Sequence, residues 1–292
     1  MRQKSSHCDP MSIQVTADAL VVIRANEVLA GLLRIVDPYA RYFVTDAGKR
    51  MVEMAESVDP CYVTFNLVRY RYFTERIREA TARYRQFLFL GAGYDTRAIS
   101  MPEFGCGSVD VFEVDYPEKL ASKQQILTQA GVSIPSYIRY VPMDLAQPGL
   151  LRRLCEMGFR PSELTMVLME GLVFFLAAET TAQLLDPGTL ELAAGSTVIF
   201  DYWSNKRINR LNQRVEGRLG RQLFSRFPFP DQPKRLQNAL AGLGYKDVTI
   251  RDMNTLVASI QQNDHEVAPP DNWFVAKAVI GSRTQASSRK HE

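Results

Sequence analysis

Residues 87–98 read FLFLGAGYDTRA, an apolar run that leads directly into a glycine turn. Such a run predicts a strand covered on both faces, and Gly91 and Gly93 would let the backbone turn tightly and approach a ligand. Asp95 is well placed to cap a helix, which we expect over 95–101. Because a dinucleotide fingerprint has a third glycine where this chain has Thr96, the two glycines alone identify no ligand.

Outward from this turn, short apolar runs alternate with helical segments. The expected strands are 86–90, 109–114, 137–141, 164–169, 197–200, 247–251 and 273–280. The expected helices between the first five are 95–101, 116–130, 149–157 and 178–193, whereas the last two strands are expected to join without a helix. The alternation predicts an α/β, Rossmann-like fold, with a seven-stranded, mostly parallel sheet, an antiparallel last strand and helices on both faces.

The length of 292 residues suits one large α/β domain, and we assign the whole chain, 1–292, to it. Helical spacing over 16–36 and 62–84 predicts an N-terminal helical cap that spans 16–84. The segment 204–236, after the fifth strand, is interpreted as a lid insertion. Residues 1–15 and 282–292 are interpreted as flexible tails.

Composition excludes several functional classes. The formal net charge of +3 is too small to indicate nucleic-acid binding. The apolar stretch 171–178 is too short to cross a membrane, and the polar first ten residues lack the apolar core of a secretion signal. The four cysteines are scattered without metal-binding spacing, so we expect a cytoplasmic protein without a metal.

Positive charge is concentrated in the segment 204–236, which holds nine Lys/Arg against two acidic residues. Such an excess could steer an anionic substrate toward the protein. A solvated helix face is the plainer explanation, and the sequence leaves both readings open.

Acidic residues end the strands that follow the glycine turn. Asp115 lies 22 residues after Gly93, where such folds place an acid against a ribose diol. Glu113, two residues earlier on the same strand, competes for that role. Asp144 is placed to accept from an adenine amine, with the Leu145 N–H donating to the ring. Glu170 ends the fourth strand.

These acids would line the edge where open α/β sheets bind ligands. An acid-lined crevice suits a ligand with positive charge, such as S-adenosylmethionine with its sulfonium and ammonium groups. It would repel the pyrophosphate of NAD. The pattern therefore favours a methyl-donor site over a dehydrogenase site.

A cationic partner for a ligand carboxylate is expected on the helix 62–84. A helical wheel places Arg69 on the apolar stripe, where a buried guanidinium must be paired, most favourably with a carboxylate. Arg76 shares that stripe, so the wheel does not choose between the two. A structural salt bridge remains an alternative role for either.

The ordered blocks of residues 19–202 resemble the leucine carboxyl methyltransferases and their bacterial relatives, which include polyketide O-methyltransferases. The blocks are RANE at 24–27, DPYA at 37–40, RYRYF at 69–73, LGAGYDTR at 90–97, FEVDYPE at 112–118, VPMDL at 141–145 and MEGLVFFL at 169–176. Tyr70 is a departure, since the family often has threonine there. Members with an extra C-terminal propeller domain modify tRNA, and this chain is too short to contain one.

The resemblance implies a role for each matching residue toward S-adenosylmethionine. It assigns the cofactor carboxylate to Arg69, the methionine part to Gly91, the ribose to Asp115 and the ammonium side to Glu170. Asp144 and Leu145 would bind the adenine.

The acceptor is predicted to be a carboxylate of an apolar small molecule or a peptide C-terminus. A carboxylic acid is ionised at neutral pH, whereas a phenol usually needs a base such as histidine. The histidines, His7, His265 and His291, lie away from the ends of the first five strands. Arg24 and Arg207 are the candidates for holding the carboxylate.

Tyr202 is expected to line the acceptor pocket and to be the residue nearest the reacting atoms, with catalysis mainly by proximity. The runner-up activity is O-methylation of a polyketide or phenolic hydroxyl, with Asp201 or His265 as base. A non-catalytic cofactor-binding protein and an NAD-dependent oxidoreductase are the remaining alternatives. Oligomeric state and pathway leave no signal in the sequence.

Overall fold

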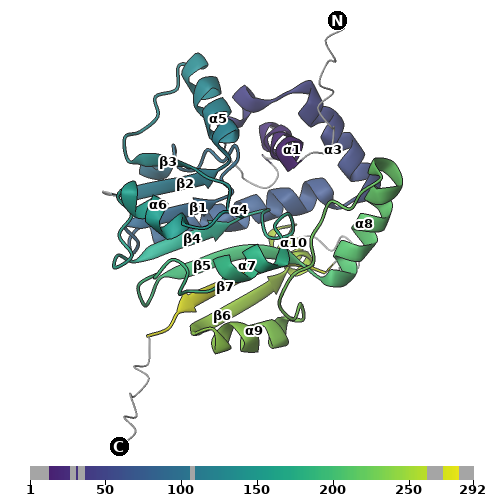
Figure 1. The fold of residues 1–292 in the computed structure, drawn as a ribbon. Coiled ribbons are helices and arrows are strands. Elements are labelled where there is room, and N and C mark those ends of the chain that lie inside the picture. Colours follow the sequence, from purple (N-terminus) through teal and green to yellow (C-terminus); the bar gives the residue numbers. More distant parts are fainter. Residues whose placement is uncertain (1–12, 27–30, 32–36, 106–108, 262–271, 283–292) are drawn as a thin grey trace, which may run out of the picture.

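The strands form one sheet, in the order β3-β2-β1-β4-β5-β7-β6 (Figure 1). The structure is a computed structural model that describes residues 13–26, 31, 37–105, 109–261 and 272–282. The first five strands pair in parallel, and β7 pairs antiparallel with both β5 and β6. The strands are β1 (Gln86–Leu90), β2 (Asp110–Asp115), β3 (Ile138–Pro142), β4 (Thr165–Met169), β5 (Thr197–Trp203), β6 (Tyr245–Asp252) and β7 (Trp273–Ile280).

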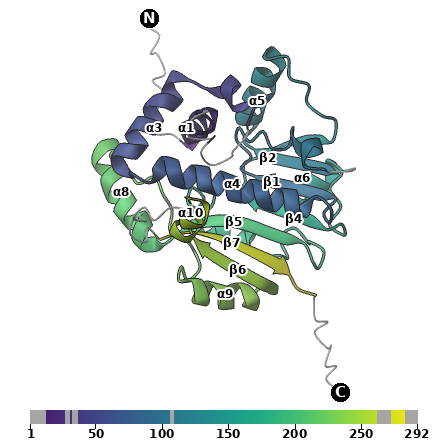
Figure 2. The ribbon, with the colours of Figure 1, turned by 180° about the vertical axis from the view of Figure 1, so that it is seen from behind.

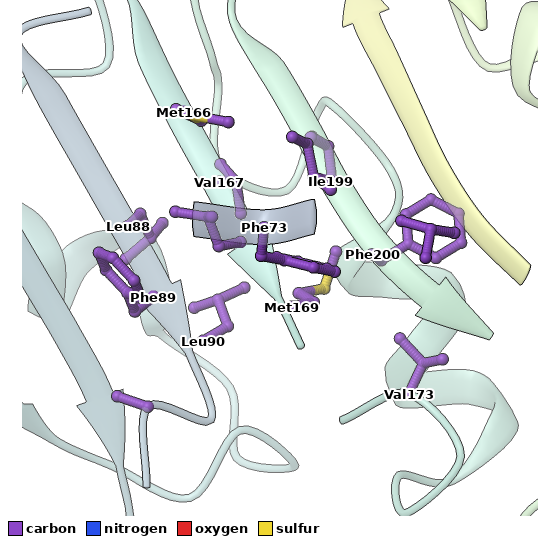
Figure 3. Packing of buried hydrophobic residues seen from close by; sticks show 14 of the residues in the cluster. Phe73, Leu88, Phe89, Leu90, Met166, Val167, Met169, Val173, Ile199 and Phe200 are labelled. Atoms are coloured by element: carbon purple, nitrogen blue, oxygen red, sulfur yellow. The ribbon is translucent and has the colours of Figure 1, made fainter. Parts of the chain in front are cut away.

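This topology confirms the predicted α/β, Rossmann-like fold. Every residue of β1, β4 and β5 is buried, as expected for central parallel strands covered on both faces. Figure 3 shows how one face is covered, with Phe73 lying among side chains of β1, β4 and β5. Phe73 is fully buried.

Helices cover both faces of the sheet. In Figures 1 and 2, α4 and α10 lie on one face and α6 and α7 on the other. The helices are α1 (Ile13–Ala25), η1 (Ala40–Phe43), α3 (Asp46–Val58), α4 (Tyr62–Ala80), η2 (Met101–Phe104), α5 (Pro117–Gln129), α6 (Leu150–Glu156), α7 (Ala178–Leu184), α8 (Asn205–Leu219), α9 (Pro233–Gly242) and α10 (Met253–Gln261). None of the described helices has the length and apolarity needed to cross a bilayer.

The helices α1, α3 and α8 lie beside one another at the carboxyl ends of the parallel strands (Figures 1 and 2). The Thr45 side chain caps α3 by accepting from the Gly48 N–H, and the Ser204 side chain caps α8 by accepting from the Arg207 N–H. Of the helix expected over 16–36, α1 accounts for the first part. Residues 27–30 and 32–36 lie outside the described residues, as do most residues of the two expected tails.

Two expected helices are wrong in whole or in part. Residues 95 and 96 are irregular and 97–100 form turns that lead into η2, because the Asp95 carboxylate accepts from both the backbone and the side chain of Arg97. The helix expected over 178–193 ends at Leu184, shortly before a Pro-Gly pair at 187–188 that cannot continue it.

A third expectation was also wrong, because α10 lies between β6 and β7 where no helix was predicted. Its residues Met253, Leu256 and Val257 follow helical spacing and are buried. The helix packs against α4 and the last two strands. This apolar stripe is the feature of the sequence from which α10 could have been predicted.

The two acids of β2 lie two residues apart, so strand alternation places them on the same face, and it is their positions along the strand that separate them. Glu113 and Lys123 of α5 form an ion pair in which both side chains are buried, whereas Asp115 faces a cavity. Burial raises the pKa of Glu113 to about 7, although Lys123 opposes this rise. Of the two acids, Asp115 is the one that lines the cavity, whereas Glu113 serves in the packing of α5 on the sheet.

We expect Lys123→Met to lower the free energy of unfolding by about 3–5 kcal/mol, because it leaves Glu113 buried without its cation. The double variant Glu113→Leu/Lys123→Met should recover most of this loss, since an apolar pair of similar size replaces the ion pair. Urea unfolding of the three proteins measures both effects. Equal stability of the single variant and the parent would contradict the expectation.

Candidate functional site

A cavity of about 210 Å³ lies at the carboxyl ends of the parallel strands. It extends from Leu145, after β3, past Asp115 of β2 and the β1 turn to Gly171, after β4, and Trp203 of β5. Because the strands lie side by side in the order β3-β2-β1-β4-β5, these residues line the cavity from one end to the other. This is the edge where open α/β sheets bind ligands.

The turn after β1 is hydrogen-bonded to the Asp115 carboxylate. The Gly93 N–H donates to Asp115 Oδ2 at 2.6 Å, and the Tyr116 N–H donates to Oδ1 at 2.7 Å. Gly91 and Gly93 have φ values of 68° and 49°, which favour glycine. A Cβ on Gly91 would lie 2.7 Å from a Leu172 methyl group. The predicted tight turn therefore lies directly beside the Asp115 carboxylate.

Burial raises the pKa of Asp115 above its ordinary value, and the two backbone N–H groups oppose this rise. Its carboxylate keeps lone pairs beyond those two bonds, since two oxygens offer about four acceptor positions. A ligand with paired hydroxyl groups could occupy them.

At the end of β3, the structure separates the two predicted adenine contacts. Leu145 lines the cavity together with Met143, whereas Asp144 is not part of the lining. Asp144 Oδ1 accepts from the Ala146 N–H at 2.9 Å, so it stabilises the local turn. This end of the cavity presents an apolar surface suited to a flat ring.

A cluster of alternating charges lies between β1, β4, β5 and α4. Glu170 accepts from Arg69 Nε at 3.1 Å through one oxygen and from Arg97 through the other. Arg69 Nη1 also donates to Asp201 at 3.2 Å, and Arg97 pairs with Asp95. All of them line the cavity except Asp201.

Asp201 lies outside the cavity lining and joins the cluster through its ion pair with Arg69. Its carboxylate accepts from the Gly171 N–H at 2.6 Å and from Trp273 Nε1 at 2.9 Å, in addition to Arg69. Burial raises the pKa of Asp201, and Arg69 acts against this rise. Burial also disfavours ionisation of Asp95, but Arg97 outweighs it and lowers the pKa of Asp95 to about 2.

The cluster carries excess negative charge. Three carboxylates (Asp95, Glu170 and Asp201) face two guanidinium groups (Arg69 and Arg97). A buried excess of this sign favours a ligand that brings positive charge. Arg69 has five N–H donors and uses two here, so it can still bind an anionic group of the same ligand.

The structure also distinguishes the two arginines that the helical wheel left open. Arg69 lines the cavity and its side chain is 3% exposed, whereas Arg76 lies outside the lining and pairs with Glu79. Arg97 was missed by the sequence analysis, although it stands in the LGAGYDTR block that was quoted. The block itself did not show whether Arg97 would be buried beside the cavity or would lie on the surface.

Arg24 and Arg207 are already paired. Arg24 lines the cavity, but it donates to Asp37 and to the Tyr94 carbonyl, both at 2.8 Å. Arg207 is 1% exposed, pairs with Asp59 and is not part of the lining. Both guanidinium groups therefore hold the walls together rather than offering an open cation.

Tyr202 is placed differently from the sequence expectation. It is fully buried and not part of the cavity lining, and its hydroxyl donates to the Asp231 carbonyl at 3.3 Å. Its ring stacks on Phe227 and Phe274. The side chain packs the side of β5 away from the cavity, so the structure gives it no access to an acceptor.

Beyond Glu170 the cavity becomes apolar. We call this part the apolar chamber; its aromatic rings contact one another, and its side chains come from α3, β5, α8 and the segments after β4 and α8. Its residues are Met51, Met54, Val58, Phe174, Phe175, Leu176, Trp203, Leu211, Val215, Leu223 and Phe224. The segment 204–236, expected to be a lid, thus contributes Leu211, Val215, Leu223 and Phe224 to the chamber wall.

Comparison with known proteins gives a consistent result. The sequence model of the leucine carboxyl methyltransferase family matches residues 19–188. A Frankia alni protein, named as a candidate S-adenosyl-L-methionine-dependent methyltransferase, is 33% identical over 207 residues, covering 66% of this chain and 70% of that protein. A similarly named protein of Mycolicibacterium smegmatis is 31% identical over 263 residues, covering 82% of this chain and 85% of its own length.

Solved structures show the same fold. A candidate methyltransferase from Thermobifida fusca superposes with a TM-score of 0.60 at 14% identity, covering 93% of this chain and 95% of that one. A DUF574 family protein from Streptomyces avermitilis gives a TM-score of 0.58 at 15% identity, covering 89% and 96%. With the family match spanning more than half of its length, the chain belongs to the leucine carboxyl methyltransferase family, and it is an S-adenosylmethionine-dependent methyltransferase.

Proposed function

We propose that this enzyme forms a methyl ester on the carboxylate of an apolar acceptor, either a small molecule or a peptide C-terminus. When bound, S-adenosylmethionine supplies a methyl group already activated on a sulfonium. The protein therefore has to orient the two reactants, keep water out and leave the acceptor oxygen ionised. The apolar chamber suits the body of such an acceptor.

The donor would lie along the polar part of the cavity. Asp115 would accept from the ribose hydroxyl groups, and Met143 and Leu145 would contact the adenine. The unused N–H donors of Arg69 would hold the methionyl carboxylate, and Glu170 would face the ammonium. The excess negative charge of the buried cluster supports this arrangement, because the donor carries a net positive charge.

One observation carries the choice of a carboxylate acceptor. Every carboxylate in the described lining already has a partner: Asp59 has Arg207, Asp95 has Arg97, Glu170 has two arginines and Asp115 has two N–H groups. Burial raises the pKa of Tyr62 to about 12, so this tyrosine does not serve as a base at neutral pH. A carboxylate needs no base, whereas a phenol does.

Methylation of a polyketide or phenolic hydroxyl is the weaker candidate. Of the two bases suggested for it, Asp201 is fully buried and bound to Arg69, Gly171 and Trp273. His265 lies outside the described residues. The apolar, aromatic chamber would accommodate such an acceptor, so the pH dependence must decide.

We expect kcat for an apolar carboxylic acid to stay constant, within about twofold, between about pH 6 and pH 9, because neither the acceptor nor a base titrates there. A phenolic acceptor should instead be methylated faster as the pH rises. Mass spectrometry of a panel of acids and phenols would measure the gain of one methyl group. Phenol ethers without any methyl ester would contradict the proposal.

A further inference from the structure

One face of α4 carries polar groups into the cavity between the apolar chamber and the charge cluster. Tyr62, Asn66 and Arg69 follow helical spacing, and all three line the cavity. Arg69 belongs to the donor side, as described above. Asn66 and Tyr62 lie one and two turns earlier, toward Asp59 and α3, and have no role in binding the donor.

The orientation of the Asn66 amide is set by its neighbour. Its nitrogen lies 2.7 Å from the Tyr62 carbonyl oxygen, which can only accept, so the group bonded there is the NH₂. The amide oxygen is therefore the atom left for other partners. In the described part of the chain no hydrogen bond reaches Oδ1, although the side chain is largely buried.

The Oδ1 atom also remains accessible. It is not one of the side-chain polar atoms that are both sealed from solvent and without a partner. The Tyr62 hydroxyl likewise has no hydrogen-bond partner among the described residues, and it lies close enough to Arg69 and Asp59 to feel both charges. An acceptor oxygen and a hydroxyl are thus the polar groups that α4 offers to a ligand in this part of the cavity.

We propose that Asn66 and Tyr62 select the methyl acceptor, which is an apolar acid that also carries an N–H or O–H group within a few bonds of its carboxylate. Asn66 Oδ1 accepts from that group, and the Tyr62 hydroxyl donates to an oxygen of the same acid. A plain aliphatic acid has no donor for Oδ1. Entry of such an acid would leave the amide oxygen buried and unsatisfied, which disfavours binding.

Helix geometry makes this arrangement compatible with methyl transfer. Residues three apart on a helix lie about 5–6 Å apart at Cβ, so an acid bound at Asn66 would lie next to the part of S-adenosylmethionine that Arg69 is proposed to hold. The proposal rests on the methyl-ester function proposed above. It adds the chemical class of acid that the cavity prefers.

The two tryptophans of the chain, Trp203 and Trp273, both line the cavity, so intrinsic fluorescence reports ligand binding without turnover. The probes are decanoic acid, 2-hydroxydecanoic acid, N-octanoylglycine and its N-methyl analogue, titrated in the presence of S-adenosylhomocysteine. We expect the parent to bind the hydroxy acid and the N–H acid about tenfold more tightly than decanoic acid. The N-methyl analogue should bind no better than decanoic acid.

Variants locate the preference. Asn66→Leu should bind all four acids equally, and Tyr62→Phe should weaken all of them by a similar factor of about threefold to tenfold. Tyr72→Phe is the matched control, since it removes a hydroxyl from the same helix outside the cavity lining, and it should keep the parent's order. Circular dichroism checks that each variant is folded.

Equal affinity of the parent for the four acids would overturn the inference, and so would a preference that survives in Asn66→Leu. Should Asn66→Leu fail to fold, the N-methyl comparison in the parent decides alone. Mass spectrometry of the same mixtures with S-adenosylmethionine tests the function separately. A retained binding preference without any methyl ester would reject the ester proposal while leaving the selection by Asn66 intact.

Discussion

Replacing Arg69 with methionine is expected to abolish binding of S-adenosylhomocysteine and to lower the free energy of unfolding by about 3–5 kcal/mol. The change removes the cation between Glu170 and Asp201 and leaves both carboxylates buried, with Asp201 fully so. It also removes the N–H donors proposed to hold the ligand carboxylate. Urea unfolding measures the loss of stability, and tryptophan fluorescence titration measures the loss of binding.

The control is Arg76→Met, which lies two turns along the same helix. Arg76 pairs with Glu79, whose side chain is 58% exposed, and exposed pairs contribute about 0–1 kcal/mol. This variant should keep its affinity and nearly all of its stability. Equal effects of the two substitutions would contradict the assignment of Arg69.

A double variant separates packing from binding. Arg69→Met/Asp201→Asn removes one of the two buried charges left behind, so it should recover part of the lost stability. Its affinity for the ligand should stay as low as that of the single variant, because the guanidinium is still missing. Recovery of both would mean that Arg69 acts only through stability.

The sheet could be predicted closely because its signals are local. Each central strand is a run of apolar residues that ends in a turn, and burial on both faces requires such a run. The same locality explains the failures. The helix expected after Asp95 depends on whether its carboxylate caps the backbone alone or also binds Arg97, and only the folded chain decides this.

The candidate site could be predicted only for residues whose side chains can point in a single direction from their place in the fold. Asp115 ends a buried strand and can face only the carboxyl edge, which is where the structure places it. Tyr202 also lies on a strand, but the face of β5 that carries it packs against Phe227 and Phe274 instead of the cavity. These two residues come from other segments of the chain, so the sequence of the strand did not show this. Arg207 was expected to meet a substrate, yet it meets Asp59, which precedes it by 148 residues.

Tyr62 and Asn66 gave no signal in the sequence for a related reason. Tyrosine and asparagine on an apolar helix are compatible with many positions, and neither forms a recognisable block. Their importance follows from what surrounds them, namely an apolar chamber that supplies few other polar groups. A site that depends on an acceptor atom without a hydrogen-bond partner can be recognised only when the hydrogen bonds of the surrounding atoms are known, and the sequence does not give these.

Asp115→Asn is the second large effect, and we expect it to weaken binding of S-adenosylhomocysteine by about 100-fold or more. Hydrogen bonds to a charged partner contribute about 1.5–3 kcal/mol each, and the amide keeps only one oxygen to accept from the Gly93 and Tyr116 N–H groups and the ligand together. Asp144→Asn is the matched control. Since Asp144 does not line the cavity, that variant should bind within a few-fold of the parent.

The pH dependence of binding distinguishes a lost charge from a disturbed turn. Only the ionised form of Asp115 can accept from both ribose hydroxyl groups, and burial raises its pKa above the ordinary value. Affinity of the parent should therefore fall as the pH is lowered through that raised pKa, beginning at a higher pH than an exposed aspartate would give. Asp115→Asn has no proton to gain there, so its weaker binding should stay constant over the same range. Parallel pH profiles of the two proteins would show that another group controls the affinity, and Asp115 would then act only by holding Gly93 in place.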